Sequence, residues 1–110
     1  MIKIFYTDYI TDESISFQEA VKMDINELKS LFLNMEAEED NFLGLSIKKG
    51  LTLQFMCLNE QTWLADIPAQ DKLGSYAKEC SVNECLELID SVYFKGAEWE
   101  IPDGLAFTPW

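Results

Sequence analysis

The chain has 110 residues, the length of one ordinary domain, and 48% of them are hydrophobic, so it can bury a core and fold as a single unit. Twenty Asp and Glu residues oppose eight lysines, which gives a formal net charge of −12, and the sequence contains neither Arg nor His. This composition disfavours nucleic acid and anionic membranes as ligands, and it removes the commonest general base and metal ligand.

The first third of the chain predicts a strand pair followed by a helix. Ile2, Ile4 and Tyr6 alternate with Lys3 and Phe5 in a segment rich in β-forming residues, and Ile15 and Phe17 alternate with polar residues in a second segment that reaches Val21. A polar, turn-like segment lies between them. Asp24 and Glu27 have the spacing of a helix capping box, and apolar residues then recur at helical spacing. We therefore expect an N-terminal strand pair and a first helix over 24–36.

The middle of the chain predicts a three-stranded antiparallel meander. Its strands are expected near 42–47, 51–57 and 62–68, and the Lys48-Lys49-Gly50 step between the first two is typical of a hairpin turn. Residues 69–79 include Gly and Ser without a sustained period, which predicts a crossing loop.

A second helix is expected over 81–94. Ser81 and Glu84 form another capping box, and Gly96 follows the last apolar position. The tail then predicts a turn between two short apolar segments. The fold class expected from these elements is α+β: one domain over 1–110, in which an antiparallel sheet packs against two helices.

The cysteines and the N-terminus suggest a compartment. Cys57, Cys80 and Cys85 form an odd set without the spacing of a zinc or redox pair, which favours reduced thiols in the core. No secretory signal is recognisable, and every apolar run is far shorter than a membrane span requires. We expect a cytoplasmic protein that does not associate with membranes.

The negative charge is concentrated in two segments. Residues 8–40 carry ten acids against Lys22 and Lys29, and residues 79–103 carry seven acids against Lys95. Such runs are often simply solvated faces that keep a protein soluble. Clustered like charge also costs stability, so binding of a basic partner is the alternative that the pattern raises.

Catalysis has little support in the sequence. Paired carboxylates such as Glu98 and Glu100, or Glu87 and Asp90, have the chemistry for acid–base work or for binding a hard cation. No phosphate-binding glycine loop, nucleophile elbow or Cys–His pair accompanies them. We expect no enzymatic activity, no cofactor and no metal, with a small carboxylate-based enzyme left as an alternative.

Several segments between residues 40 and 110 form a combination of features. They are the run Asp40-Asn41-Phe42-Leu43-Gly44-Leu45, the paired strands 51–58 and 63–67, Cys80-Ser81 opening a helix that ends at Tyr93-Phe94-Lys95-Gly96, and the terminal Trp110. Together these segments resemble the immunity proteins of bacterial polymorphic-toxin and contact-dependent growth-inhibition systems.

The resemblance implies a small protein that binds the C-terminal domain of a cognate toxin and neutralises it. Many such toxins are nucleases, whose basic substrate surface an acidic inhibitor can cover. A nucleic-acid mimic that inhibits DNA-binding proteins is a second interpretation. The family supplies no fixed contact residues, so local charge clustering selects the expected partner-binding residues: Glu36, Glu38, Glu39, Asp40, Glu98, Trp99 and Glu100.

Overall fold

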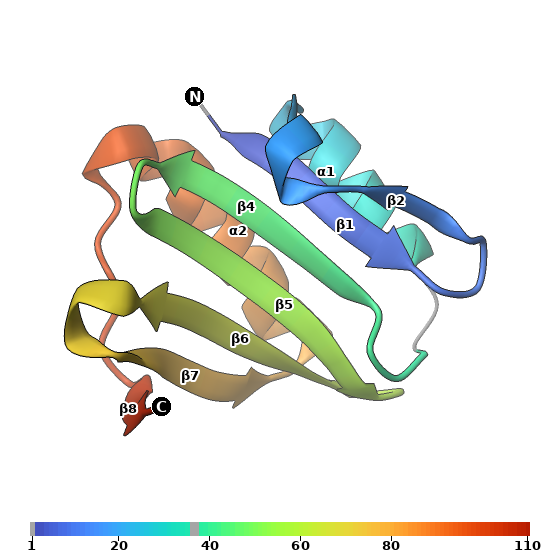
Figure 1. Ribbon diagram of the computed structural model, residues 1–110. Helices are drawn as coiled ribbons and strands as arrows, with labels where there is room; N and C mark the ends of the chain where they lie inside the picture. The colour runs from blue at the N-terminus through green and yellow to red at the C-terminus, as the bar shows by residue number, and fades with distance from the viewer. Residues whose placement is uncertain (1, 36–37) are drawn as a thin grey trace.

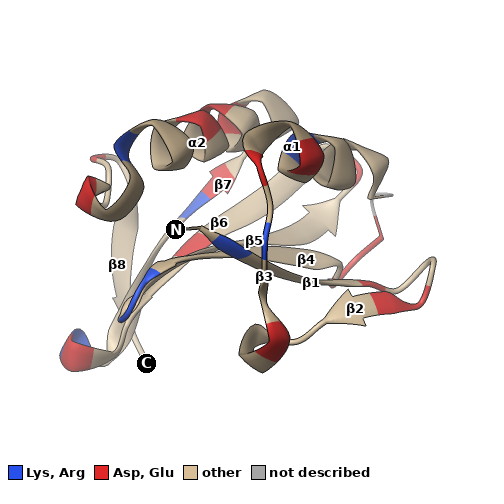
Figure 2. Cartoon of the chain, turned by 90° about the horizontal axis from the view of Figure 1, so that it is seen from above, with Lys and Arg blue, Asp and Glu red and all other residues tan. Residues whose placement is uncertain are grey.

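The computed structural model describes residues 2–35 and 38–110, which form an eight-stranded sheet with two α-helices over one of its faces (Figures 1 and 2). The predicted α+β class is confirmed. The strands are β1 (Lys3–Asp8), β2 (Glu13–Ile15), β3 (Val21–Lys22), β4 (Phe42–Lys48), β5 (Leu51–Asn59), β6 (Thr62–Ala69), β7 (Gly74–Cys80) and β8 (Ala106–Pro109). The helices are α1 (Ile25–Asn34) and α2 (Val82–Lys95), and three 3-10 turns are η1 (Phe17–Glu19), η2 (Gln70–Lys72) and η3 (Gly96–Glu98).

Every described strand pair is antiparallel, and the strand order is β2-β1-β4-β5-β6-β7-β8, with β3 also paired to β1. The chain therefore forms β1 with its hairpin partner, covers one face of the sheet with α1, and returns to add β4 on the other side of β1. From there β4 to β7 run as consecutive hairpins across the sheet (Figure 1).

The predicted caps fix the helix starts. Asp24 accepts a hydrogen bond from the backbone N–H of Glu27 at 2.9 Å, at the start of α1. Ser81 and Glu84 form a reciprocal capping box at the start of α2. These contacts satisfy backbone donors that the first turn of a helix leaves free. Gly96 follows α2 with a positive φ of 58°, a conformation in which glycine is favoured.

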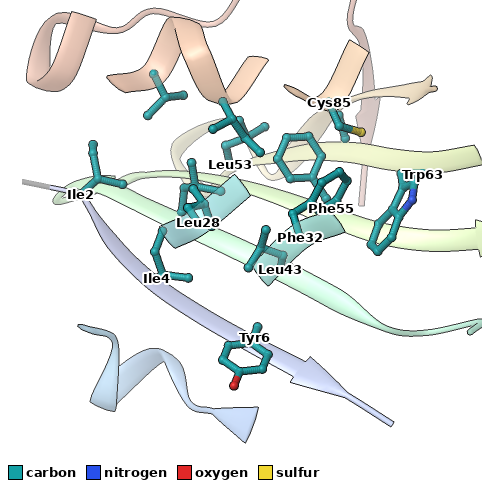
Figure 3. Packing of buried hydrophobic residues seen from close by; sticks show 14 of the residues in the cluster. Ile2, Ile4, Tyr6, Leu28, Phe32, Leu43, Leu53, Phe55, Trp63 and Cys85 are labelled. Atoms are coloured by element: carbon teal, nitrogen blue, oxygen red, sulfur yellow. The ribbon is translucent and has the colours of Figure 1, made fainter. Parts of the chain in front are cut away.

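The core lies between the sheet and the helices (Figure 3). Phe32 of α1 packs against Trp63 of β6 and Phe55 of β5, with ring centroids 4.8 and 5.9 Å apart. Tyr93 of α2 donates a hydrogen bond from its hydroxyl to the carbonyl of Met23 at 2.8 Å, which joins α2 to the segment before α1. The free thiols Cys57, Cys80 and Cys85 are buried, as the sequence predicted.

Two elements differ from the expectations. The loop predicted over 69–79 is wrong, because this segment contains η2 and then strand β7, which pairs with β6 at seven positions. The strand predicted over 15–21 is also interrupted: β2 ends at Ile15, η1 follows, and only Val21–Lys22 pairs again. Small residues such as Ser75 and Ala77 hide the apolar period of β7, so backbone pairing rather than side-chain burial defines this strand.

Candidate functional site

The first predicted acidic cluster forms a tight turn immediately before β4. Glu38, Glu39 and Asp40 are exposed, and Glu36 lies outside the described residues. The turn is held by the N–H of Asn41, which donates to the carbonyl of Glu38 at 3.0 Å, and by that of Asp40, which donates to the carbonyl of Cys57 at 3.3 Å. These bonds fix the backbone while the three carboxylates remain in solvent.

The second predicted cluster is only partly a surface. Glu98 and Glu100 are exposed, but Trp99 is 3% exposed and belongs to the hydrophobic core. Its indole Nε1–H donates to the hydroxyl of Ser91 at 2.9 Å. The rings are therefore packed in the core, and the polar N–H has a hydrogen-bond acceptor within the protein. The prediction that Trp99 faces a partner is therefore wrong, since it anchors the segment after α2.

The structure separates the two clusters. Glu38, Glu39 and Asp40 precede β4, whereas Glu98 and Glu100 surround a hollow of about 890 Å³ together with Lys48, the last residue of β4. The seven residues of β4 span roughly 20 Å at about 3.3 Å per residue. Lys95 and Asp103 also line this hollow, so two lysines stand beside three carboxylates and offset part of their charge.

A hydrogen-bond network centred on Asn41 joins the β1–β2 hairpin, which carries further acids, to the first cluster. The side chain of Asn41 is fully buried; its Oδ1 accepts from the backbone N–H of Tyr9 at 2.7 Å, and its Nδ2 donates to Oδ1 of Asp8 at 3.1 Å. The same Asp8 oxygen accepts from the N–H groups of Ile10 and Thr11 at 3.0 and 3.4 Å. This network ties the tip of the β1–β2 hairpin to the turn that holds the first cluster.

We call the resulting surface the acidic end of the sheet. It combines the β1–β2 turn, the turn before β4 and the β5–β6 turn, whose exposed acids are Asp12, Glu13, Glu38, Glu39, Asp40 and Glu60. No lysine occurs within residues 9–14, 38–41 or 58–62. Two large apolar side chains are exposed among the acids: Tyr9 is 56% exposed and Ile10 is 49% exposed.

Lysines gather at the opposite end of the sheet. Lys3 begins β1 and pairs with Lys22 of β3. Lys48 ends β4, Lys49 lies in the β4–β5 turn, and Lys72 lies in the β6–β7 turn. Figure 2 shows red segments on the hairpin that contains β2 and blue segments toward the N-terminus. Acids also lie at this end, namely Asp71, Glu98, Glu100 and Asp103, so it is mixed in charge, whereas the three turns of the acidic end carry no lysine. The sequence segments alone do not reveal this difference between the two ends.

The acidic end also affects the nearest thiol. Burial raises the pKa of Cys57, and the negative charges of Glu38 and Glu39 raise it further, while a backbone hydrogen bond with Asn59 partly opposes this. A raised pKa keeps the thiol protonated at neutral pH, so Cys57 is a poor nucleophile.

The described residues also bear on metal binding and on insertion into a membrane. Within residues 2–35 and 38–110, no three Cys, Asp or Glu side chains come together in a group suited to a metal ion. None of the described helices is long and apolar enough to cross a membrane. What the acidic end offers chemically is charge, hydrogen-bond acceptors and two apolar side chains, which suit recognition of a basic surface.

Comparisons of this chain with protein-family models, with curated proteins and with solved structures find no match.

Proposed function

We propose that this chain is an immunity protein that binds a basic toxin domain of the nuclease class and neutralises it by covering the toxin's substrate-binding surface. The observation that carries the proposal is the acidic end, where six exposed carboxylates lie at three turns together with the exposed side chains of Tyr9 and Ile10, and where residues 9–14, 38–41 and 58–62 contain no lysine. The net charge of −12, the absence of arginine and the resemblance of residues 40–110 to immunity proteins support it as well.

The physical basis is complementarity to a surface that binds phosphate. A nuclease needs Lys and Arg to hold a nucleic-acid backbone, and a concentrated group of carboxylates attracts that surface over long range and speeds encounter. Exposed aromatic and aliphatic side chains then supply the apolar contact that electrostatic steering lacks, and Tyr is among the residues that most often dominate interface energies.

The rigid attachment of the hairpin tip favours tight binding. Asn41 and Asp8 hold the backbone of Tyr9, Ile10 and Thr11 through three hydrogen bonds, and a fourth joins the two side chains to each other, so little conformational freedom remains to be lost on docking. Glu98 and Glu100 take a minor part in the proposal, because Lys48 and Lys95 lie beside them.

The test compares two double variants with the same change in charge. Glu38→Lys with Glu39→Lys alters the acidic end, and Glu98→Lys with Glu100→Lys alters the opposite end. If the gene immediately upstream encodes a large protein with a variable C-terminal domain, that domain is the partner to test. The measurements are its affinity for each variant and the survival of cells that produce both proteins. We expect the first variant to bind at least about tenfold more weakly than the second.

Two results would count against the proposal. Full protection by the first double variant would remove the acidic end from the interface, and equal losses in both would mean that only the overall charge matters. Comparable binding to several unrelated basic DNA-binding proteins would favour a nucleic-acid mimic instead, because an immunity protein should select its cognate toxin.

A further inference from the structure

A groove of about 650 Å³ is lined by residues of β1, β4, β5 and β6 and by the segment 14–17. The two helices cover one face of the sheet (Figure 2), and the groove belongs to the other face. Side chains alternate along each strand, so residues whose neighbours enter the core point toward this face. Strand pairing sets Phe42 opposite Met56 and Met56 opposite Leu64, and in the next row it sets Gln54 opposite Asp66. These five side chains and Phe17 line the groove.

One wall of the groove is built from aromatic rings. Phe5 points away from the helices, and its ring lies over Gly44, where an added Cβ would come within 2.0 Å of it. The ring of Phe17 meets that of Phe5 edge-on at 5.3 Å, and Phe42 lies 6.4 Å from Phe5. Phe5 is thereby 5% exposed, whereas Phe17 is 55% exposed and presents an aromatic surface to solvent.

The one ionisable side chain that lines the groove, among the described residues, is Asp66. It sits on the central strand β6 beside Leu64, and of the residues described no lysine lies within ion-pair distance of it. Burial raises the pKa of Asp66, and a hydrogen bond with Ser75 only partly opposes this effect. The carboxylate is thus partly desolvated without a cation to compensate it.

We propose that this groove binds the arginine side chain of a peptide segment in which an apolar residue stands next to the arginine. A guanidinium is planar and weakly hydrated, donates two parallel hydrogen bonds to a carboxylate and packs well on aromatic rings. Asp66 supplies the carboxylate, Gln54 an additional amide acceptor, and Phe17 and Phe42 the aromatic wall. The neighbouring apolar residue packs on Met56 and Leu64. The groove borders the acidic end, but none of the six carboxylates of the acidic end lines it, and the proposal does not depend on the proposed toxin.

The first experiment uses the wild-type protein and a small probe, N-acetyl-phenylalanyl-arginine amide. Amide chemical shifts are followed by NMR during titration at about 0.15 M salt, where nonspecific attraction to a negative protein is screened. Saturable shifts are expected at Gln54, Met56 and Asp66. A probe carrying citrulline, the neutral isostere of arginine, should bind about tenfold more weakly because it lacks the charge-assisted bonds.

The second experiment compares Asp66→Asn with Asp71→Asn, which removes the same charge from the exposed turn η2. Asp66→Asn should lower probe affinity about tenfold, whereas Asp71→Asn should leave it unchanged. Equal binding of the two probes to the wild-type protein, shifts confined to the acidic end, or equal losses in the two variants would overturn the proposal. Even if Asp66→Asn fails to fold, the comparison of the arginine and citrulline probes on the wild-type protein tests whether the groove recognises the guanidinium. Failure of toxin binding would leave this result intact.

Discussion

Replacement of Asn41 by alanine tests whether the hairpin tip is held as the structure indicates. Asn41 is fully buried and joins two segments that are 33 residues apart in the sequence through its contact with Asp8. The substitution removes the bond to the Tyr9 N–H and the bond to the Asp8 carboxylate, and it leaves a small cavity in their place.

The expected cost follows from these two bonds. A neutral hydrogen bond contributes about 1 kcal/mol net, and one to a charged group contributes about 1.5–3 kcal/mol, so Asn41→Ala should lower the free energy of unfolding by about 2–4 kcal/mol. The matched control is Asn34→Ala. Asn34 is exposed at the end of α1 and bonds only weakly to the hydroxyl of Ser30, at 3.4 Å, so its loss should cost less than about 0.5 kcal/mol.

Urea unfolding followed by tryptophan fluorescence measures both variants, since Trp63 and Trp99 are each 3% exposed in the folded protein. Hydrogen exchange should also accelerate selectively at the amides of Tyr9, Ile10 and Thr11, which the network protects. A loss for Asn41→Ala no larger than that for Asn34→Ala, with unchanged exchange at the hairpin tip, would refute the assigned role of the network.

Three further outcomes are expected. Gly44→Ala should lower the free energy of unfolding by about 1–3 kcal/mol, because the new methyl group would displace the Phe5 ring. Differential scanning calorimetry measures this loss as a lower unfolding temperature. Burial raises the pKa of Tyr93 to about 12 from 10.0, so the contribution of its neutral phenol to stability is complete below pH 10 and is lost as the pH rises to about 12. Tyr93→Phe should flatten the alkaline decline in unfolding free energy and cost about 1 kcal/mol at neutral pH, since the bond to Met23 is lost. Burial raises the pKa of Cys85 to about 12, so a thiol reagent at pH 8 should modify it only after unfolding, and rapid labelling of the folded protein would contradict this.

The helices and the meander were predictable because their signals are local. Ser81 and Glu84 lie three residues apart, so the capping box can be identified from the sequence, and the structure contains both of its hydrogen bonds. The Lys49-Gly50 turn is equally local, and Gly50 adopts a positive φ of 80° between β4 and β5. In each case neighbouring residues alone determine the conformation.

The missed features depend on contacts between distant segments. The sequence places Glu38 and Asp12 in one broad acidic stretch, but only the buried Asn41 side chain shows that their turns are attached to each other. The exposure expected for Trp99 is wrong for a similar reason. Its glutamate neighbours suggest exposure, but Trp99 follows the turn η3 and is buried in the core, where the hydroxyl of Ser91 of α2 accepts the indole N–H.

The separation of charge along the strands determines how a basic partner would approach. The acidic end and the lysine-rich end are roughly 20 Å apart along β4, more than twice the Debye length of about 8 Å at physiological ionic strength. A cationic domain near Glu38 and Glu39 therefore experiences their field with little opposition from Lys48 and Lys49. Net charge alone would make those four residues equivalent in magnitude, whereas the geometry makes the two glutamates dominant for association. The association rate with a basic partner should consequently fall when both glutamates are neutralised to glutamine, and it should change little when both lysines are, although each double change alters the total charge by two.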